Sequence, residues 1–466
     1  MRMPNSKQMS EEQIDIYEEA PLDGAILVTG PPGTGKTVIA FLRAQTVANL
    51  KGKSVVSMYN KVLSHYTSNV ADGAFDVKTF HSWVSSWWNM LKVPDNNQAK
   101  NDNNNKSRIY LACPYAEKDK AKKLGARFDG SKKKWYVTSE IYNGNEAAFE
   151  KWMGASNCIM ALPKLPEDNW HHDWDQVFSS ILQEVKLGNI NKDDVNWGHL
   201  IIDEAQDFPS KMFGTFEMLI KLVFSDDPLE DRPSLTVFAD ENQRLQEATN
   251  STIKEIINKL MLPEDRIYSL TRNYRNTLQI ASLAKVFYTG LSTGIPELPD
   301  REGELPLLVS GDNLNASVNY IHIFANNHDD LEIGVITQSN EVRKKFFNKL
   351  NHRVSGNSRL KVQSYANNDS KHGDVDKLDF DKGGIITVIN KQSCKGLEFD
   401  AVFLPELQSI SIDPNDKDQF MMEMYVMTSR ARDTLVLMYS NKGDTEPLIL
   451  SNIPDESSGL LEYKYA

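Results

Sequence analysis

One octapeptide constrains this chain of 466 residues more than any other feature. The segment 30–37, G-P-P-G-T-G-K-T, follows the apolar run 25–28 and precedes the apolar, helix-like stretch 38–50. It matches G-x-x-x-x-G-K-[ST] between a strand and a helix, a loop whose backbone N–H groups close around phosphates. The sequence therefore predicts a nucleoside triphosphate site. Its expected nucleotide-binding residues are Gly30, Gly33, Thr34, Gly35, Lys36 and Thr37.

Short, nearly continuous apolar runs recur along the chain, and several end at a glycine-rich or acidic turn. Nearly continuous apolar strands suit a parallel sheet buried on both faces, and here they alternate with stretches of helical periodicity. The pattern predicts an α/β fold with parallel sheets. The runs are 25–28, 54–56, 200–202, 235–238, 333–336, 385–388, 401–404 and 434–437.

The run 200–202 ends at adjacent carboxylates, in the sequence Asp203-Glu204-Ala205-Gln206-Asp207. A strand that delivers two acids beside a phosphate loop places one to hold Mg²⁺ and the other to polarise an attacking water. We expect Asp203 and Thr37 to hold the metal and Glu204 to act as the base. Acidic strand ends are common, so this one predicts a catalytic site only because the same chain also contains the phosphate loop.

Charge is unevenly distributed along the chain. The sequence has 52 Lys and Arg against 64 Asp and Glu, a net charge of −12, and its 40% hydrophobic and 25% charged residues exclude fibrous, disordered and membrane-spanning classes. Without a signal-peptide pattern or an apolar run of about 20 residues, we expect a cytoplasmic protein. Residues 91–136 nevertheless carry 12 Lys and Arg against 5 Asp and Glu, a local +7 that leaves −19 on the other 420 residues.

The phosphate loop and the D-E-A-Q-D segment together resemble the superfamily 1A helicases of the UvrD, Rep and PcrA kind. Later segments resemble that family's ordered motifs, namely F-A-D-E-N-Q-R from Phe238, L-T-R-N-Y-R-N from Leu270, K-G-L-E-F-D from Lys395 and Y-V-M-T-S-R-A-R from Tyr425. The resemblance implies two RecA-like P-loop NTPase domains with ATP and Mg²⁺ between them. The implied boundaries are 1–90 for the first part of domain 1A, 91–154 for an inserted basic accessory domain 1B, 155–268 for the second part of domain 1A, and 269–466 for domain 2A with a reduced 2B-type insertion near 340–384.

The resemblance also implies a role for each matched residue around the nucleotide. Gln13, in S-E-E-Q, would read the adenine edge, although the same four residues equally suit a helix cap. Tyr274 would stack on adenine, and Glu398 would meet the ribose hydroxyls. Gln243 would sense the γ-phosphate. Two arginines from the second domain would also reach that phosphate, so hydrolysis would depend on closure of the two domains around the nucleotide. The implied catalytic residues are Lys36, Glu204, Gln243, Arg275 and Arg430.

A second implied set contacts single-stranded DNA. Within the motor it consists of Tyr59, Asn60, Thr79, His81, Asn390 and Gln392. Thr79 and His81 belong to T-F-H-S, which on its own is more often the start of a helix. Asn390 and Gln392 stand where the family more commonly has Thr and His, which makes this pair the weakest part of the match.

Residues 110–129 and 132–136 resemble a small domain of unknown function found in some plasmid and primase-type proteins. Basic residues alternate there with aromatic ones, a mixture that suits phosphate contacts combined with stacking on bases. We expect Lys132 and Trp135 to contact DNA. The alternative is that the aromatic side chains form the core of the module while the lysines solvate it.

The function implied by these resemblances is that of an ATPase that converts ATP and water to ADP and phosphate while moving along DNA. Single-stranded or tailed DNA would be its partner, with 3′ to 5′ movement. Translocation is better supported than processive strand separation, because the second accessory domain is tiny or absent. The alternative is an ATP-gated DNA-sensing or regulatory subunit that works with a protein partner in a repair or phage-defence complex.

Overall fold

The computed structural model describes residues 9–59, 61–62, 64–65, 73, 75–94, 108–111, 113–114, 117–130, 134–143, 145–149, 152, 159–166, 168–243, 250–291, 293–366, 369, 372–412, 417–441 and 447–466. The expected connector at 96–106 and the candidate residues Asn60 and Lys132 lie outside these ranges. The chain divides into two compact units. Unit 1 comprises Met1–Trp83, Trp197–Ile220 and Asp226–Ala466, and unit 2 comprises Val84–Asn196 and Lys221–Ser225.

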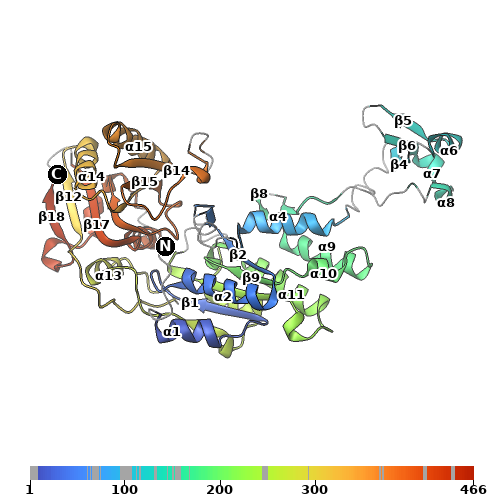
Figure 1. Cartoon of the computed structure of the whole chain (residues 1–466), viewed down its shortest axis with the longest axis horizontal. Coiled ribbons are helices and arrows are strands. Elements are labelled where there is room, and N and C mark those ends of the chain that lie inside the picture. The colour runs from blue at the N-terminus through green and yellow to red at the C-terminus, as the bar shows by residue number, and fades with distance from the viewer. Residues whose placement is uncertain are drawn as a thin grey trace. The chain divides into compact units, whose positions relative to one another are not determined.

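Unit 1 contains a six-stranded sheet in which all neighbouring strands are parallel (Figure 1). Its order is β11 (Ile267–Ser269), β1 (Ala25–Thr29), β10 (Ser234–Ala239), β9 (His199–Ile202), β2 (Ser54–Met58) and β3 (Asp76–Thr79). The four central strands are buried along nearly their whole length, whereas the edge strands β11 and β3 are partly exposed. Four of the predicted apolar runs form these central strands, as expected for a sheet covered on both faces.

The register of this sheet brings three loops to one edge. Thr29 at the end of β1 lies opposite Ala239 of β10, and Val237 of β10 lies opposite Ile202 of β9. Segments that follow parallel strands leave the sheet at the same edge, where open α/β sheets bind their ligands. The loop 30–37, the acidic segment after Ile202 and the turn after Ala239 therefore meet there.

A second sheet in unit 1 has seven strands, again parallel at every pairing. Its order is β14 (Lys361–Tyr365), β15 (Ile385–Asn390), β13 (Glu332–Thr337), β16 (Phe399–Leu404), β17 (Ala431–Ser440), β12 (Leu307–Gly311) and β18 (Glu462–Tyr465). The remaining four predicted runs lie in β13, β15, β16 and β17. The prediction of an α/β fold with parallel sheets is thus confirmed.

The stretch 340–384, expected to hold a reduced insertion, is in large part regular structure of this sheet. Helix α15 (Asn340–Val354) and strand β14 occupy much of it, and β14 pairs with β15 at five positions from Lys361 to Tyr365. Arg343 of α15 is buried and donates hydrogen bonds to Ser364 (2.5 Å) and Asp369 (2.6 Å). The stretch 340–384 is polar in composition because α15 is solvated on one side and β14 is an edge strand.

Helices connect and cover the strands of unit 1, two of them extending into residues of unit 2. They are α1 (Glu11–Ile14), the π-helix Asp15–Glu19, α2 (Lys36–Lys51), α4 (Phe80–Leu91), α11 (Ser210–Val223), α12 (Ile253–Leu260), α13 (Leu278–Lys285), α14 (Leu314–Asn327), α15 and α16 (Lys417–Thr428). Short 3-10 helices cover Ala205–Asp207, Leu229–Asp231, Glu241–Gln243, Glu264–Arg266, Val375–Lys377, Leu407–Ser409, Leu448–Asn452 and Glu456–Ser458. Among the described residues, no helix combines the length and the apolar character that crossing a bilayer requires.

Unit 2 extends beyond the expected insertion 91–154 and contains two small antiparallel sheets. Its first sheet has the order β4 (Arg108–Leu111), β6 (Lys134–Thr138), β5 (Arg127–Asp129), and its second pairs β7 (Lys164–Leu165) with β8 (Asp168–His172). Its other helices are α6 (Lys118–Lys123), α7 (Ser139–Tyr142), α8 (Glu146–Phe149), α9 (Trp174–Lys186) and α10 (Lys192–Val195). A compact core lies beside the three-stranded sheet and is formed by Leu111, Ala121, Ala126, Val137, Phe149 and Trp152.

Candidate active site

The phosphate loop 30–37 joins β1 to α2 in a tightly closed conformation. Gly33 and Gly35 have φ angles of +82° and +90°, which residues with a side chain rarely adopt. A Cβ atom at Gly33 would overlap the Asn273 side chain, and one at Gly35 would lie 2.5 Å from Nε2 of Gln13. The loop geometry therefore requires glycine at both positions.

Lys36 is buried and is held by the carbonyls of its own loop. Its Nζ donates to the carbonyl oxygens of Gly30 (2.5 Å) and Pro31 (3.0 Å) and lies 3.9 Å from Oδ2 of Asp240. The Thr34 hydroxyl also donates to the Pro31 carbonyl (2.9 Å). The ammonium group thus stays inside the loop, close to the carboxylate that ends the neighbouring strand β10.

Gln13 forms the helix cap that the sequence left open as the alternative, and it also contacts the phosphate loop. Its backbone N–H donates to the Ser10 hydroxyl (3.3 Å) and its Oε1 accepts from the Ser10 backbone N–H (3.1 Å), which makes a capping box. Its Nε2 meanwhile donates to the carbonyl of Thr34 in the phosphate loop (2.9 Å). One side chain therefore caps α1 and positions the phosphate loop.

Arg43 of α2 anchors the segment that carries Gln13. The guanidinium is completely buried and donates to the carbonyls of Ile16 (2.8 Å), Ala20 (3.0 Å) and Pro21 (2.6 Å). These carbonyls lie in and just after the π-helix Asp15–Glu19. A π-helix leaves its last carbonyls without helical partners, and Arg43 supplies donors for them.

Asp203 and Glu204 lie side by side, with opposite pKa shifts. The Thr37 hydroxyl donates to Oδ2 of Asp203 (2.7 Å), while burial and the neighbouring Glu204 charge raise the pKa of Asp203 to about 6. Burial also acts to raise the pKa of Glu204, but the ammonium groups of Lys395 and Lys36 outweigh it and lower that pKa. Glu204 therefore remains a carboxylate at neutral pH.

A chain of side-chain hydrogen bonds leads from Glu204 to an arginine beside the other sheet. Gln206 Nε2 donates to Oε2 of Glu204 (2.6 Å), and its Oε1 accepts from the backbone N–H of Asp240 (3.0 Å). Gln243 Nε2 donates to Oδ2 of Asp240 (2.7 Å), and its Oε1 accepts from Nη2 of Arg430 (2.7 Å). Every member of this network is buried.

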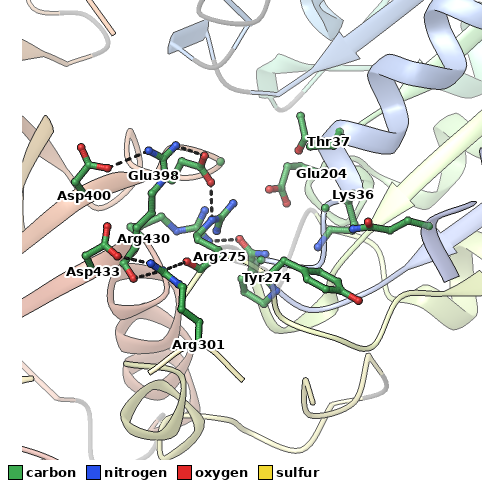
Figure 2. A pocket seen from close by; sticks show the side chains of 18 residues that line it. Lys36, Thr37, Glu204, Tyr274, Arg275, Arg301, Glu398, Asp400, Arg430 and Asp433 are labelled. Atoms are coloured by element: carbon green, nitrogen blue, oxygen red, sulfur yellow. Dashed lines mark hydrogen bonds and ion pairs between the residues drawn. The ribbon is translucent and has the colours of Figure 1, made fainter. Parts of the chain in front are cut away.

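Glu398, Arg430 and Arg432 from the second sheet form the other side of the site, together with Arg275 from the segment after β11 (Figure 2). Glu398 precedes β16 and accepts from Nε of Arg275 (2.7 Å) and from Nη2 of Arg432. Although burial opposes it, the charges of these two arginines hold the pKa of Glu398 well below its usual range. Arg430 precedes β17, and burial, reinforced by the nearby Arg275 charge, lowers the pKa of its guanidinium.

These groups line one cavity of about 610 Å³ (Figure 2). The sequence-predicted residues on its wall are Gln13, Gly33, Gly35, Lys36, Thr37, Glu204, Gln243, Tyr274, Arg275, Glu398 and Arg430. Gly30, Thr34 and Asp203 contact those residues but do not line the cavity themselves. Tyr274 is exposed. Its N–H donates to the Gly33 carbonyl (2.8 Å), and the Arg272 guanidinium lies 5.8 Å from its ring centre.

Two arginines on the cavity wall had no role in the sequence prediction. Arg432 holds Glu398 and also donates to Asp400 (3.1 Å). Arg301 pairs with Asp433 and donates to the carbonyls of Arg275 (2.6 Å) and Arg432 (2.7 Å). Arg432 could have been suspected from its place two residues after Arg430, whereas Arg301 lies in a loop without a recognisable pattern.

A buried ion pair connects the two sheets near the cavity. Nζ of Lys395, in the loop before β16, lies 2.6 Å and 2.5 Å from the two carboxylate oxygens of Asp207, after β9. Their side chains are only 4% and 5% exposed. Burial raises the pKa of Asp207 to about 6 even though the Lys395 charge opposes the shift. The last acid of D-E-A-Q-D therefore serves a contact between sheets.

Tyr59, Thr79 and His81, which the family resemblance implies at a DNA contact, come together at the edge of the first sheet. Met58 at the end of β2 lies opposite Thr79 at the end of β3, and the Tyr59 ring centroid lies 6.4 Å from that of His81. Thr79 also acts as the helix start that the alternative predicts, because its hydroxyl accepts from the Ser82 N–H (3.3 Å). The three residues thus share the sheet edge used by the phosphate loop, with two strands between β1 and β2.

The other DNA candidates lie in different surroundings. Asn390 is buried at the end of β15 and bonds to Asn340 (2.9 Å) and to the N–H of Ser393 (2.8 Å), while Gln392 is exposed. Trp135 packs against the core of unit 2. Asn390 therefore has an established structural role, and Gln392 is the more accessible of this pair.

Known proteins resemble parts of the chain. Residues 108–154 match the family described as Domain of unknown function (DUF5710), within the segment expected to resemble such a domain. No curated protein matches the chain. The chain is also similar to the C-terminal domain of a possible DNA helicase from Lactobacillus plantarum WCFS1, with 21% identity, 41% of this chain and 98% of that chain covered, and a TM-score of 0.30.

Proposed function

We propose that the chain is an ATP-dependent DNA translocase of the superfamily 1A kind, which hydrolyses ATP to move 3′ to 5′ along single-stranded DNA. One observation carries the proposal: a single cavity collects the phosphate loop and Glu204 from one parallel sheet and Glu398 and Arg430 from the other, with Arg275 bonded to Glu398. In our proposal these sheets are the cores of two RecA-like domains. The domain boundaries are those implied by the motifs, with 340–384 now assigned mainly to the second domain.

The residues present fit ATP and Mg²⁺ as the bound groups. Gln13 and Tyr274 would hold the base, and the phosphate loop with Lys36 would hold the phosphates. The half-buried Thr37 hydroxyl and the buried Asp203 carboxylate, 2.7 Å apart, form an oxygen donor set of the kind Mg²⁺ prefers. Bound Mg²⁺ would neutralise charge on the phosphates.

The chain's own side chains would perform the remaining work. Glu204, kept ionised by Lys395 and Lys36, would accept a proton from the attacking water. Arg275 and Arg430 would stabilise charge on the transferred phosphoryl group. Gln243 bonds Arg430 directly, so it would transmit the state of the cavity to the segment before β17.

Tyr59, Thr79 and His81 would contact the DNA strand at the carboxyl edge of the first sheet. Because the loops after β1, β9 and β2 leave the same edge, a change at the nucleotide would reach the strand through a short path. Since 340–384 leaves little room for a second accessory domain, we expect directional movement to exceed duplex unwinding.

The deciding experiment is the ATPase rate with and without single-stranded DNA. We expect the DNA to accelerate hydrolysis by the wild-type chain and expect Lys36→Ala and Glu204→Gln to abolish both rates. Lys345→Ala and Glu341→Gln, at exposed positions of α15, are the matched controls and are expected to keep both rates. An unchanged rate with DNA contradicts translocation and favours the DNA-sensing or regulatory subunit. Tailed duplexes of opposite polarity then test direction.

A further inference from the structure

The three-stranded sheet of unit 2 has two chemically different faces. Neighbouring residues of a strand point to opposite faces, and Leu111 and Val137 belong to the buried core. Trp135, two positions from Val137, packs against the same core. Tyr110 and Tyr136 are the sequence neighbours of these residues and therefore lie on the opposite face of the sheet.

On that opposite face the two tyrosines form a pair. Tyr110 of β4 lies directly across from Tyr136 of β6, and their ring centroids are 5.9 Å apart with the planes inclined by 52°. The Tyr110 hydroxyl donates to Asp129 (2.7 Å), a largely buried carboxylate, which fixes the ring. Both tyrosines are partly exposed. The face thus presents two aromatic rings whose orientations are set by the sheet.

A cation stands beside this pair. Arg127 of β5 lies directly across from Tyr136 and is exposed. Within the part of the chain that the structure describes, no carboxylate forms an ion pair with Arg127. An exposed guanidinium next to partly exposed rings combines a phosphate contact with a stacking surface.

The surrounding sequence has the charge that a nucleic acid requires. Residues 91–136 carry a net +7, whereas the rest of the chain carries −19. A positive segment on an otherwise acidic protein attracts a polyanion locally, and exposed aromatic rings allow bases to stack without sequence preference. Single-stranded DNA is favoured over a duplex, because its bases can leave their own stacks.

We propose that Tyr110, Tyr136 and Arg127 form a second binding site for single-stranded DNA, on the open face of the unit 2 sheet. The two rings stack on bases, and the guanidinium contacts a phosphate. The choice of DNA as the strand rests on the proposed function, but the site uses no residue of the candidate active site. Trp135 is not part of this site, since it lies on the other face and packs on the core, with Lys122 Nζ 5.5 Å from its ring centre.

Binding by the full chain, without nucleotide, tests this site. The probe is a fluorescein-labelled oligodeoxythymidylate followed by anisotropy. We expect Tyr136→Ala to weaken binding at least about 5-fold and Tyr136→Phe, which keeps the ring, to restore it. Arg127→Ala is expected to weaken binding and to reduce the slope of log K against log salt by about 0.7, the contribution of one single-strand phosphate contact.

Phe128→Ala provides the matched control. Phe128 is the next residue of β5 and is 53% exposed, but it lies across from Trp135 on the other face of the sheet. Its loss is expected to change the affinity less than twofold. The proposal is overturned if Phe128→Ala and Tyr136→Ala lose the same affinity for the oligonucleotide. It is also overturned if Tyr136→Ala and Arg127→Ala both keep the wild-type affinity and salt slope.

Cross-linking locates the strand directly. An oligonucleotide containing 5-iodo-2′-deoxyuridine is irradiated with the full chain, and the adducts are mapped by mass spectrometry. We expect adducts at Tyr110 or Tyr136, and adducts confined to unit 1 overturn the site. If these adducts form but DNA does not stimulate the ATPase, the second site stands and the translocase proposal fails. If DNA stimulates the ATPase without such adducts, the second site alone fails.

Discussion

At the scale of single residues, Arg430 is the side chain that joins the candidate chemistry to the second sheet. It lines the cavity, donates to Gln243 Oε1 and is almost completely buried. We expect Arg430→Ala to lower kcat of the DNA-stimulated ATPase by about 10³-fold, because an arginine that stabilises phosphoryl transfer contributes about that much. Arg359→Ala, which removes an arginine that is 79% exposed, is the control and is expected to retain the wild-type rate. A kcat for Arg430→Ala within threefold of wild type would remove Arg430 from the chemistry.

Glu332, at the start of β13, gives a pH-dependent prediction away from the cavity. It is buried, and burial together with the nearby Asp381 charge raises its pKa to about 7. In the unfolded chain the group ionises near its ordinary value, so the folded state binds more protons between these two pKa values. The free energy of unfolding therefore falls as pH rises from about 4.5 to about 7.

Glu332→Gln removes this ionisation with little change of shape. We expect the variant to unfold at a higher temperature than wild type at pH 8, by an amount equivalent to about 1–3 kcal/mol, and at the same temperature near pH 4.5. Thermal unfolding at several pH values measures the difference. Glu341→Gln, at an exposed glutamate, is expected to show no such trend above pH 5. A Glu332→Gln difference that does not vary with pH would contradict the assignment.

Individual residues also show what the sequence can and cannot predict. The phosphate loop, Asp203 and Glu204 could be predicted because each belongs to a short pattern with a fixed chemical meaning. Arg301 could not be predicted. Its guanidinium is held at the cavity by the backbone carbonyls of Arg275 and Arg432, which are far apart in the sequence and come together only in the fold. Trp135 and Tyr136 cannot be told apart by residue type, since both are aromatic. They lie on opposite faces of the sheet only because neighbouring residues of β6 point in opposite directions.

At the scale of elements, the polar edges of the sheets explain why three of the outer strands escaped prediction. The central strands are buried on both faces and so consist mostly of apolar residues. The strands β3, β14 and β18 lie at sheet ends, and their sequences D-V-K-T, K-V-Q-S-Y and E-Y-K-Y carry polar residues because one side meets water. Such strands cannot be distinguished from loops by hydrophobic pattern alone.

The junction between α2 and the π-helix Asp15–Glu19 provides a prediction for an element. Arg43→Ala would leave three carbonyls without their donors, at a cost of about 2–4 kcal/mol locally. Because Gln13 is carried by this segment, we expect the KM for ATP to rise several-fold with little change in kcat. Hydrogen exchange in 11–20 is expected to accelerate. Arg353→Ala, an exposed arginine on α15, is the control. Unchanged exchange in 11–20 would show that Arg43 does not hold the segment.

At the scale of the whole molecule, the Lys395–Asp207 pair is a buried electrostatic contact between the two sheets of unit 1. Removing one partner leaves an uncompensated buried charge, which typically costs about 3–5 kcal/mol, whereas replacing both by apolar groups costs far less. We expect Lys395→Met and Asp207→Leu each to lower the melting temperature clearly and the double variant to recover most of the loss.

The exposed pair Lys345 and Glu341 serves as the comparison for that cycle. Both residues lie on α15, and their side chains are 54% and 78% exposed. Exposed pairs of this kind contribute at most about 0.5 kcal/mol, so the corresponding cycle is expected to show almost no coupling. Strictly additive losses for Lys395→Met and Asp207→Leu would mean that the buried pair does not connect the sheets energetically.

The position of Lys36 has a consequence for the thermodynamics of nucleotide binding. Freezing a lysine side chain costs about 1.5–2 kcal/mol of rotamer entropy. Here folding already meets that cost, because the carbonyls of Gly30 and Pro31 hold the ammonium inside the loop. When a nucleotide binds, a phosphate oxygen replaces a carbonyl oxygen as the acceptor for the Lys36 ammonium, so the lysine side chain loses no further rotamer freedom. We therefore expect calorimetry to find that Lys36 contributes to binding almost wholly through enthalpy.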